Sequence, residues 1–278
     1  MTITTEQLEG FRARLREEER SEATIAKYLR DVASFALWLG EDALSKERAL
    51  DWKARLTEAG YVPASINTKL SALNGFLRFL GREDCAVRFL KVQRRLFRDR
   101  DRELTREEYE RLLQTARSLG RERLELLMET ICATGIRVSE VRFITVEAVR
   151  EGRADVALKG KIRTILLPGK LCRKLRKYAA RQKIASGEIF LTGAGRPISR
   201  TQIWAEMKAI CDKAGVEPKK VFPHNLRHLF ARLFYRVCRD IVRLADVLGH
   251  SSIETTRIYL ISTGEEHARQ MELLRLVL

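Results

Sequence analysis

The chain has 278 residues, 45% of them hydrophobic, which is enough apolar material for one large domain or two of ordinary size. Its 53 basic and 37 acidic side chains give a net charge of +16, typical of a protein that binds a polyanion. No apolar run reaches the roughly 18 residues of a membrane-spanning helix, and the N-terminus does not resemble a signal peptide. Five scattered cysteines without a C-x-x-C pair predict reduced core residues in the cytoplasm.

Residues 1–92 predict a small all-helical domain. From Ser21 to Leu39 apolar residues recur at three- and four-residue steps, as one face of an amphipathic helix requires. A second such helix is expected to begin after Pro63 and to end at Gly81. Its polar side chains are expected to point away from the core: Asn67, Asn74 and Arg78.

Residues 93–103 alternate in charge and show little apolar periodicity, which predicts a basic linker. The pattern Thr105-x-x-Glu108 then reads as a capping box that opens a new helix. Residues 104–278 therefore predict a second domain, larger than the first and also mainly helical. The expected organisation is two helical domains joined by a short basic segment.

One β-hairpin is expected in the second domain. Two short apolar-rich runs, Ala154–Leu158 and Arg163–Leu167, flank the basic stretch Lys159-Gly160-Lys161-Ile162. The stretch is not a nucleotide-binding loop, because it lacks both the upstream glycine and the hydroxyl that follows the lysine in such loops. The predicted fold class is thus mainly α with a small β-hairpin in the second domain.

Polar residues of chemical interest follow helix ends in this domain. Gly249 ends an apolar helical stripe and His250 comes directly after it. Ser251-x-x-Glu254 then predicts a capped helix that carries Tyr259 about two turns from its start. We expect the junction and this helix to border one cleft.

Two further segments could supply cationic groups to that cleft. Pro223 predicts a helix start that places His224 and Arg227 three residues apart on one face. Arg137 follows a break at Gly135. Taken singly, these residues also fit plain structural roles, such as hydrogen-bonded helix ends or a local ion pair of Arg137 with a nearby glutamate.

The combination resembles the active site of the tyrosine recombinase (phage integrase) family. Four segments are similar to family segments: LTREEYERLL, ATGIRVSE, FPHNLRHLFA and LADVLGHSSIETTRIY. The resemblance implies a two-domain clamp, with a core-binding domain followed by a catalytic domain. It is greatest for Xer-like or short mobile-element enzymes, since no additional N-terminal arm-binding domain is evident. The catalytic set it implies is Arg137, Lys159, His224, Arg227, His250 and Tyr259.

These residue types suit attack on a phosphodiester. Arginine stays protonated and binds phosphate oxygens bidentately, so Arg137 and Arg227 form the expected clamp. The tyrosine hydroxyl needs help to lose its proton, and His224 is the candidate acceptor. Because the leaving 5′ oxygen needs a proton, the resemblance implies Lys159 as general acid, with Lys161 as the alternative. His250 is expected to bind the scissile phosphate.

By the same resemblance Glu140 supports the arginine segment, and the product is a 3′-phosphotyrosyl link with a free 5′ hydroxyl. The scheme requires no cofactor and no metal ion. Its partner is double-stranded DNA, bound partly by basic residues of the linker and hairpin: Arg94, Arg95, Arg98 and Lys161. Family members act as tetramers on two DNA sites. The apolar segment Glu272–Leu278 fits exchange of C-terminal tails between subunits, in a cytoplasmic, nucleoid-associated enzyme.

Two alternatives remain open. A tyrosine-type (IB-like) topoisomerase shares the chemistry but does not join two sites. A non-catalytic DNA-binding regulator derived from an integrase would share the fold. Chromosome-dimer resolution, integration or excision of an element, and DNA inversion all fit a recombinase.

Overall fold

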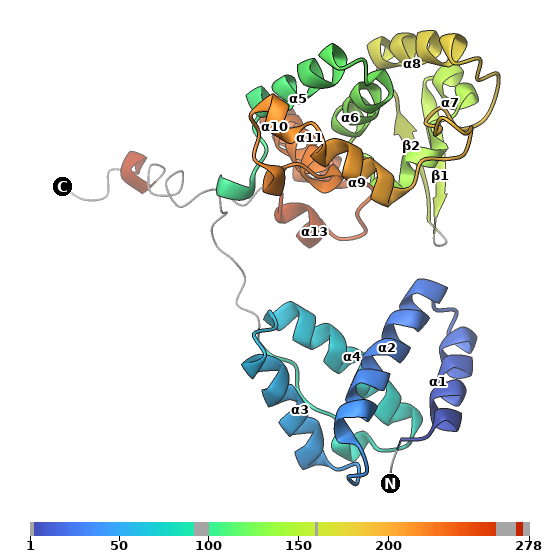
Figure 1. Ribbon diagram of the computed structural model, residues 1–278. Coiled ribbons are helices and arrows are strands. Elements are labelled where there is room, and N and C mark those ends of the chain that lie inside the picture. Colours follow the sequence, from blue (N-terminus) through green and yellow to red (C-terminus); the bar gives the residue numbers. More distant parts are fainter. Residues whose placement is uncertain (1–2, 92–99, 159–160, 260–270, 275–278) are drawn as a thin grey trace. The chain divides into compact units, whose positions relative to one another are not determined.

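A computed structural model describes residues 3–91, 100–158, 161–259 and 271–274 (Figure 1). The chain divides into two compact units, Met1–Arg94 and Arg95–Leu278. Both units are mainly helical, and the second contains a two-stranded antiparallel sheet. The predicted fold class is confirmed.

The first unit is a helical domain in which each main helix has one apolar side. The face predicted from the periodicity of Ser21–Leu39 is buried, since Ile25, Val32 and Phe35 are at most 2% exposed. Ser21 caps the helix, its hydroxyl accepting from the backbone N–H of Thr24. The elements are α1 (Thr5–Glu17), α2 (Glu22–Leu39), α3 (Lys46–Glu58), α4 (Pro63–Phe79) and the 3₁₀ turn η1 (Glu83–Cys85).

Two asparagines of α4 do not point away from the protein, contrary to the prediction. The Asn67 carboxamide donates to the carbonyl of Leu90 at 2.9 Å and accepts from its N–H at 2.8 Å. Asn74 makes the same pair of bonds with Val87, at 2.8 and 3.0 Å. The reason is that the extended chain beyond η1 runs along α4, and its backbone groups need partners. Both asparagines therefore attach this segment to the helix.

We expect Asn74→Ala to expose the Val87 amide. Removing one partner of a hydrogen bond costs about 1–3 kcal/mol, so hydrogen exchange at Val87 should accelerate about 5- to 150-fold. Exchange measured by NMR or mass spectrometry tests this. Thr68→Ala is the matched control, because the Thr68 hydroxyl only bonds the Ala64 carbonyl on an exposed part of the same helix. Equal protection of Val87 in both variants would contradict the prediction.

In the second unit, helices pack around a core to which α6 and α11 contribute centrally (Figure 1). Thr105 forms the predicted capping box with Glu108 at the start of α5. The helices are α5 (Arg106–Ser118), α6 (Glu122–Thr134), α7 (Val146–Glu151), α8 (Gly169–Arg181), α9 (Arg200–Lys208), α10 (Cys211–Ala214), α11 (Pro223–Cys238), α12 (Ile241–Leu248) and α13 (Ile253–Arg257). The 3₁₀ turns are η2 (Arg100–Arg102), η3 (Val138–Phe143) and η4 (Pro218–Lys220).

The hairpin is present, but its strands extend further than predicted. β1 covers Arg153–Leu158 and β2 covers Lys161–Leu166, with Leu158 paired to Lys161. The prediction of a four-residue basic tip was therefore wrong. Pairing of backbone groups continues through Lys161 and Ile162, because strand ends are set by hydrogen bonding and not by side-chain polarity. Residues 159–160 lie outside the described residues.

The end of the predicted linker packs on the second unit. The Arg102 carbonyl accepts a hydrogen bond from the Asn225 side chain at 2.7 Å, and Glu103 pairs with Arg232 at 2.5 Å. Leu104 directly follows and is 1% exposed. Residues 100–103 are thus part of the second unit. The predicted DNA-contacting Arg94, Arg95 and Arg98 lie outside the described residues.

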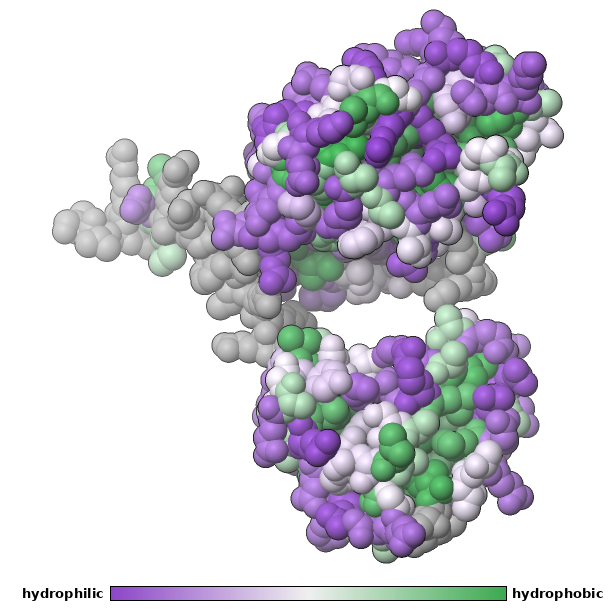
Figure 2. All heavy atoms as spheres, in the orientation of Figure 1, coloured by the Kyte–Doolittle hydropathy of each residue, from purple (hydrophilic) through white to green (hydrophobic). Residues whose placement is uncertain are grey.

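The remaining predictions concern the surface and the cysteines. All five cysteines are free, and Cys85, Cys132, Cys172 and Cys211 are buried. Figure 2 shows that hydrophilic residues dominate the visible face of the second unit. Among the described residues, no helix combines the length and apolar character needed to cross a membrane.

Candidate active site

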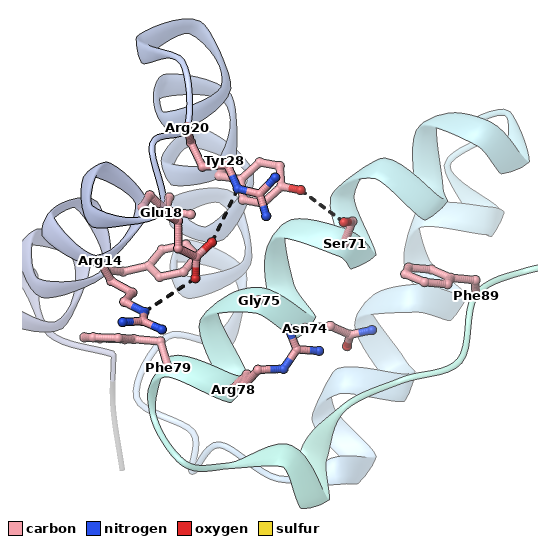
Figure 3. A pocket seen from close by; sticks show the side chains of 12 residues that line it. Arg14, Glu18, Arg20, Tyr28, Ser71, Asn74, Gly75, Arg78, Phe79 and Phe89 are labelled. Carbon is pink, nitrogen blue, oxygen red and sulfur yellow. Dashed lines mark hydrogen bonds and ion pairs between the residues drawn. The ribbon is translucent and has the colours of Figure 1, made fainter. Parts of the chain in front are cut away.

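A hollow of about 580 Å³ in the first unit lies between α1, α2 and α4 (Figure 3). Arg14 and Arg20 at its rim both pair with Glu18. Its two hydroxyl side chains, Tyr28 and Ser71, bond each other at 3.2 Å. All four histidines of the chain lie in the second unit. No histidine therefore lies beside these hydroxyls, and the Glu18 carboxylate is occupied by two arginines, so the chemistry is sought in the second unit.

Residues from distant segments meet at the C-terminal end of α12. Three arginines, each from a different element, donate to three consecutive backbone carbonyls there. The bonds are Arg163 to Val247 at 2.9 Å, Arg227 to Leu248 at 2.8 Å and Arg137 to Gly249 at 3.4 Å. We call Arg137, Arg163 and Arg227 the arginine cluster. Carbonyls at a helix end lack intrahelical partners and carry partial negative charge, which is why cations gather at this place.

Gly249 allows the cluster to close on the helix end. It adopts φ +64°, in the left-handed region that favours glycine. A Cβ atom at this position would lie 2.4 Å from Cδ of Arg163. Gly135 is similar, with φ +65° and a virtual Cβ 2.4 Å from the Phe230 ring. The glycines that end α6 and α12 thus permit both the turn and the close packing.

Arg227 is the most enclosed member of the cluster, with 1% of its surface exposed. It donates to the Gly135 carbonyl at 2.5 Å and contacts His250 Nε2 at 2.9 Å, in addition to its bond to α12. Burial lowers the pKa of Arg227 to about 10, as does the charge of Arg137, while a hydrogen bond to Tyr259 raises it. The guanidinium remains protonated at neutral pH.

Glu140 links two members of the cluster. Its Oε1 accepts from Arg137 Nη1 at 3.0 Å, and its Oε2 accepts from Arg163 Nη2 at 2.5 Å. Oε2 also accepts from the Arg137 backbone N–H at 2.7 Å. Burial by itself would raise the pKa of Glu140, but the Arg137 N–H and the Arg163 charge bring it below its ordinary value. The carboxylate is therefore ionised and shared.

His250 connects the cluster to the turn that follows. Arginine can only donate, so His250 Nε2 accepts from Arg227, and Nδ1 donates to the Thr256 hydroxyl at 2.8 Å. Burial, together with the charges of Arg227 and Arg137, lowers the pKa of His250 to about 4. The imidazole is therefore neutral at physiological pH, with its proton on Nδ1.

Tyr259 lies just beyond α13, in a turn, and not two turns into a helix as predicted. α13 begins after Ser252 and ends at Arg257, and the Tyr259 N–H bonds the Thr256 carbonyl three residues back. The reason is local packing: Thr256 is fully buried against His250, and Tyr259 turns inward until 3% of it is exposed. The helix end thus brings the tyrosine to the arginine cluster.

Three imidazoles surround the Tyr259 ring. The ring centroid of His228 lies 4.3 Å away, that of His250 5.6 Å away and that of His224 5.9 Å away. Loss of surrounding water lowers the pKa of His224, as do the charges of Arg227 and Arg137. A neutral His224 can accept a proton.

The structure brings five of the six predicted catalytic residues into one place. The sixth, Lys159, lies outside the described residues, and for Lys161 only the backbone pairing in β2 is described. Sequence reasoning missed three participants, each of which left a signal. His228 lies four residues after His224, on the same helix face. Arg163 follows the period-two pattern of inward-facing residues in its strand. Thr256 precedes Tyr259 by three residues.

The site contains no obvious place for a metal ion. Within the described residues, no group of three or more His, Cys, Asp or Glu side chains has the arrangement of a metal site. What the site does offer is a concentration of positive charge beside a tyrosine hydroxyl. Such an arrangement suits an anionic group such as a phosphate.

Comparison with known families agrees with this geometry. Residues 102–266 match the phage integrase family, and residues 8–84 match the N-terminal SAM-like domain of phage integrases. The chain belongs to the phage integrase family. It is thereby a tyrosine recombinase, and a site-specific recombinase by the names of its relatives.

Relatives cover nearly the whole integrase chain. Tyrosine recombinase XerA of Thermococcus kodakarensis is 32% identical over 100% of this chain and 98% of its own. Tyrosine recombinase XerD of Xanthomonas campestris is 32% identical over 88% and 85%. In fold, the chain is similar to a lambda integrase tetramer bound to a Holliday junction, with TM-score 0.73 and 20% identity over 91% of this chain and 76% of that one.

The close packing of Gly249 predicts an unequal effect of two alanine substitutions. Gly152 also ends a helix at positive φ, +75°, but no atom lies within 4 Å of a Cβ there. Gly152→Ala should therefore cost only the left-handed strain, about 1–2 kcal/mol. Gly249→Ala should melt at least about 4 °C lower than Gly152→Ala, because Arg163 must also move. Equal melting temperatures by calorimetry would disprove the steric argument.

Proposed function

We propose that this recombinase binds double-stranded DNA and cleaves one strand with Tyr259, forming a 3′-phosphotyrosyl link. The observation that carries the proposal is the position of Tyr259, which is 3% exposed and has its ring stacked 5.6 Å from that of His250, whose Nε2 accepts a hydrogen bond from Arg227 of the arginine cluster. A scissile phosphate bound by Arg227 would lie beside both the tyrosine and a permanent cation. Displacement at phosphorus needs its nucleophile and its charge-stabilising group held together in this way.

Each of the described residues has a separate chemical role in this proposal. Arg137 and Arg227 would stabilise negative charge on the non-bridging oxygens as the new bond forms. His250 would donate to the same phosphate once Arg227 turns to the substrate and the imidazole takes the tautomer with its proton on Nε2, in which Nδ1 accepts from the Thr256 hydroxyl. Glu140 would keep Arg137 in place. In the reverse reaction a 5′ hydroxyl attacks the phosphotyrosine, which restores the phosphodiester and releases the tyrosine without any external energy source.

Two proton transfers accompany cleavage. The Tyr259 hydroxyl loses a proton as its oxygen bonds phosphorus, and His224, neutral by its lowered pKa, is the proposed acceptor. The departing 5′ oxygen gains a proton as its bond to phosphorus breaks. Lys159 at the end of the hairpin is the proposed donor, with Lys161 as the alternative.

The finer assignments are also proposals. We infer that Arg94, Arg95, Arg98 and Lys161 contact the DNA backbone. We further infer that residues 1–92 and the second unit form two domains, joined by a basic segment, which close on the duplex as a clamp. We infer a tetramer on two sites, in the cytoplasm at the nucleoid. The similarity to a lambda integrase tetramer on a Holliday junction supports the tetramer. The Xer names of relatives that span the chain favour recombination over relaxation by a topoisomerase or simple regulation.

Tyr259→Phe tests the nucleophile. We expect the unaltered protein to form a covalent adduct with a nicked suicide substrate in EDTA, visible on a denaturing gel, and the variant to form none while binding DNA equally well. A persistent adduct in the variant would mean another nucleophile. DNA binding without an adduct from the unaltered protein would favour the regulator.

A sulfur substitution at the 5′ bridging atom distinguishes the two lysines. A thiol, with a pKa of about 8.5, leaves without protonation, whereas an alcohol does not. We expect Lys159→Ala to slow cleavage of the oxygen substrate about 10²- to 10⁴-fold and to be rescued by sulfur. Lys161→Ala should slow the oxygen substrate much less. The opposite pattern would assign the general acid to Lys161.

The apolar tail predicts a contact between subunits. Met271, Leu273 and Leu274 are more than 60% exposed. Deleting residues 272–278 should abolish complexes that hold two DNA sites, while binding to one site changes by less than about threefold. Native gels with a labelled duplex measure both. Arg275→Gln is the control that retains the apolar side chains, and two-site complexes that survive the deletion would disprove tail exchange.

A further inference from the structure

We infer that Arg163 is a positioning residue for strand cleavage, which holds Glu140, and through it Arg137, against the C-terminal end of α12. The inference rests on the proposed function, because it assigns Arg137 to the phosphate clamp. Arg163 itself need not touch DNA. Its role is to hold the Arg137 segment and the C-terminal end of α12 at fixed positions relative to each other.

The contacts of Arg163 connect three elements. From β2 it donates to the Val247 carbonyl at the end of α12 and to Oε2 of Glu140 in η3. Its side-chain carbons and Nε pack over Gly249, where a Cβ atom would collide with them. One side chain thus joins the hairpin, the Arg137 segment and the turn that carries His250.

Stability alone does not explain an arginine at this position. Arg163 is paired with Val156 across the hairpin, and the neighbouring inward residues Ala154 and Ile165 are at most 4% exposed. The Arg163 side chain is 15% exposed, and its Nε is buried without a hydrogen-bond partner. Replacing a whole buried ion pair by apolar side chains is often neutral or stabilising, so a buried pair is weak evidence for a stabilising role. The contacts of Arg163 with the site explain an arginine at this position better than stability does.

The shared carboxylate explains how Arg163 acts on the clamp. Glu140 is 3% exposed and divides its oxygens between Arg163 and Arg137. Without Arg163, the whole carboxylate charge faces Arg137 and would draw that guanidinium away from the phosphate. Lys161 lies two residues before Arg163 on the same strand. Arg163 therefore also fixes the strand that carries the alternative general acid, Lys161.

The test is single-turnover cleavage of a suicide substrate by the full chain. Arg163→Met removes the charge at similar volume. Arg163→Lys keeps the charge, but its ammonium group cannot hold two acceptors in the geometry of a guanidinium. Arg153→Met is the matched control, since Arg153 lies on β1 of the same hairpin in an exposed ion pair. DNA affinity and melting temperature are measured for every variant.

We expect Arg163→Met to cleave at least about 100-fold more slowly, with DNA affinity within about threefold and a lower melting temperature, because the buried Glu140 carboxylate loses one of its partners. Arg163→Lys should lose at least about tenfold, and the control should match the unaltered protein. A cleavage rate for Arg163→Met within threefold of the unaltered protein overturns the inference. If Arg163→Met does not fold, Arg163→Lys decides by the same criterion.

A double-mutant cycle with Glu140→Gln tests the path of the effect. If Arg163 acts through Glu140, the double variant should cleave no more slowly than about the worse single variant. Losses that multiply would mean that Arg163 acts independently and would overturn the inference. Failure of the unaltered protein to form an adduct refutes the proposed function, whereas an active protein indifferent to Arg163 refutes this inference alone.

Discussion

The end of helix α12 is the feature on which the rest of the site depends. Its last carbonyls have no partners within the helix, and the arginine cluster supplies them from three separate elements. The hairpin, the segment after α6 and helix α11 are thereby held at fixed positions around one point. His250 follows directly in the chain, and Tyr259 reaches the same point by the turn after α13.

The electrostatic consequence is a site prepared for an anion. The site holds three arginines and one ionised carboxylate, which binds two of them, and the adjacent His250 is neutral because its pKa is low. Burial lowers the pKa of Arg227, and the repelling charge of Arg137 lowers it as well. A phosphate would relieve this repulsion, and in the free protein the carbonyls of α12 and the Tyr259 hydroxyl do so partly.

Much of this fold could be predicted from local rules. The capping box at Thr105, the proline start of α11 and the left-handed glycine after α12 are set by a few neighbouring residues, and all three are confirmed. Predictions failed where a contact with a segment distant in sequence determined the direction of a side chain or the end of a helix. Asn67 and Asn74 look like surface polar residues until the chain returns along α4, and Tyr259 leaves the helical path because Thr256 packs on His250.

The sequence by itself determined the family, the helical character and five of the residues that meet at the site, because motif spacing, helix caps and apolar periodicity are local properties of a chain. Only the tertiary structure decided how these residues share their charges. Glu140 serves two arginines, Arg163 faces inward, and the α12 carbonyls are the common acceptors. These relations join residues up to 112 positions apart, and no local pattern specifies which of many arginines will meet a given carbonyl.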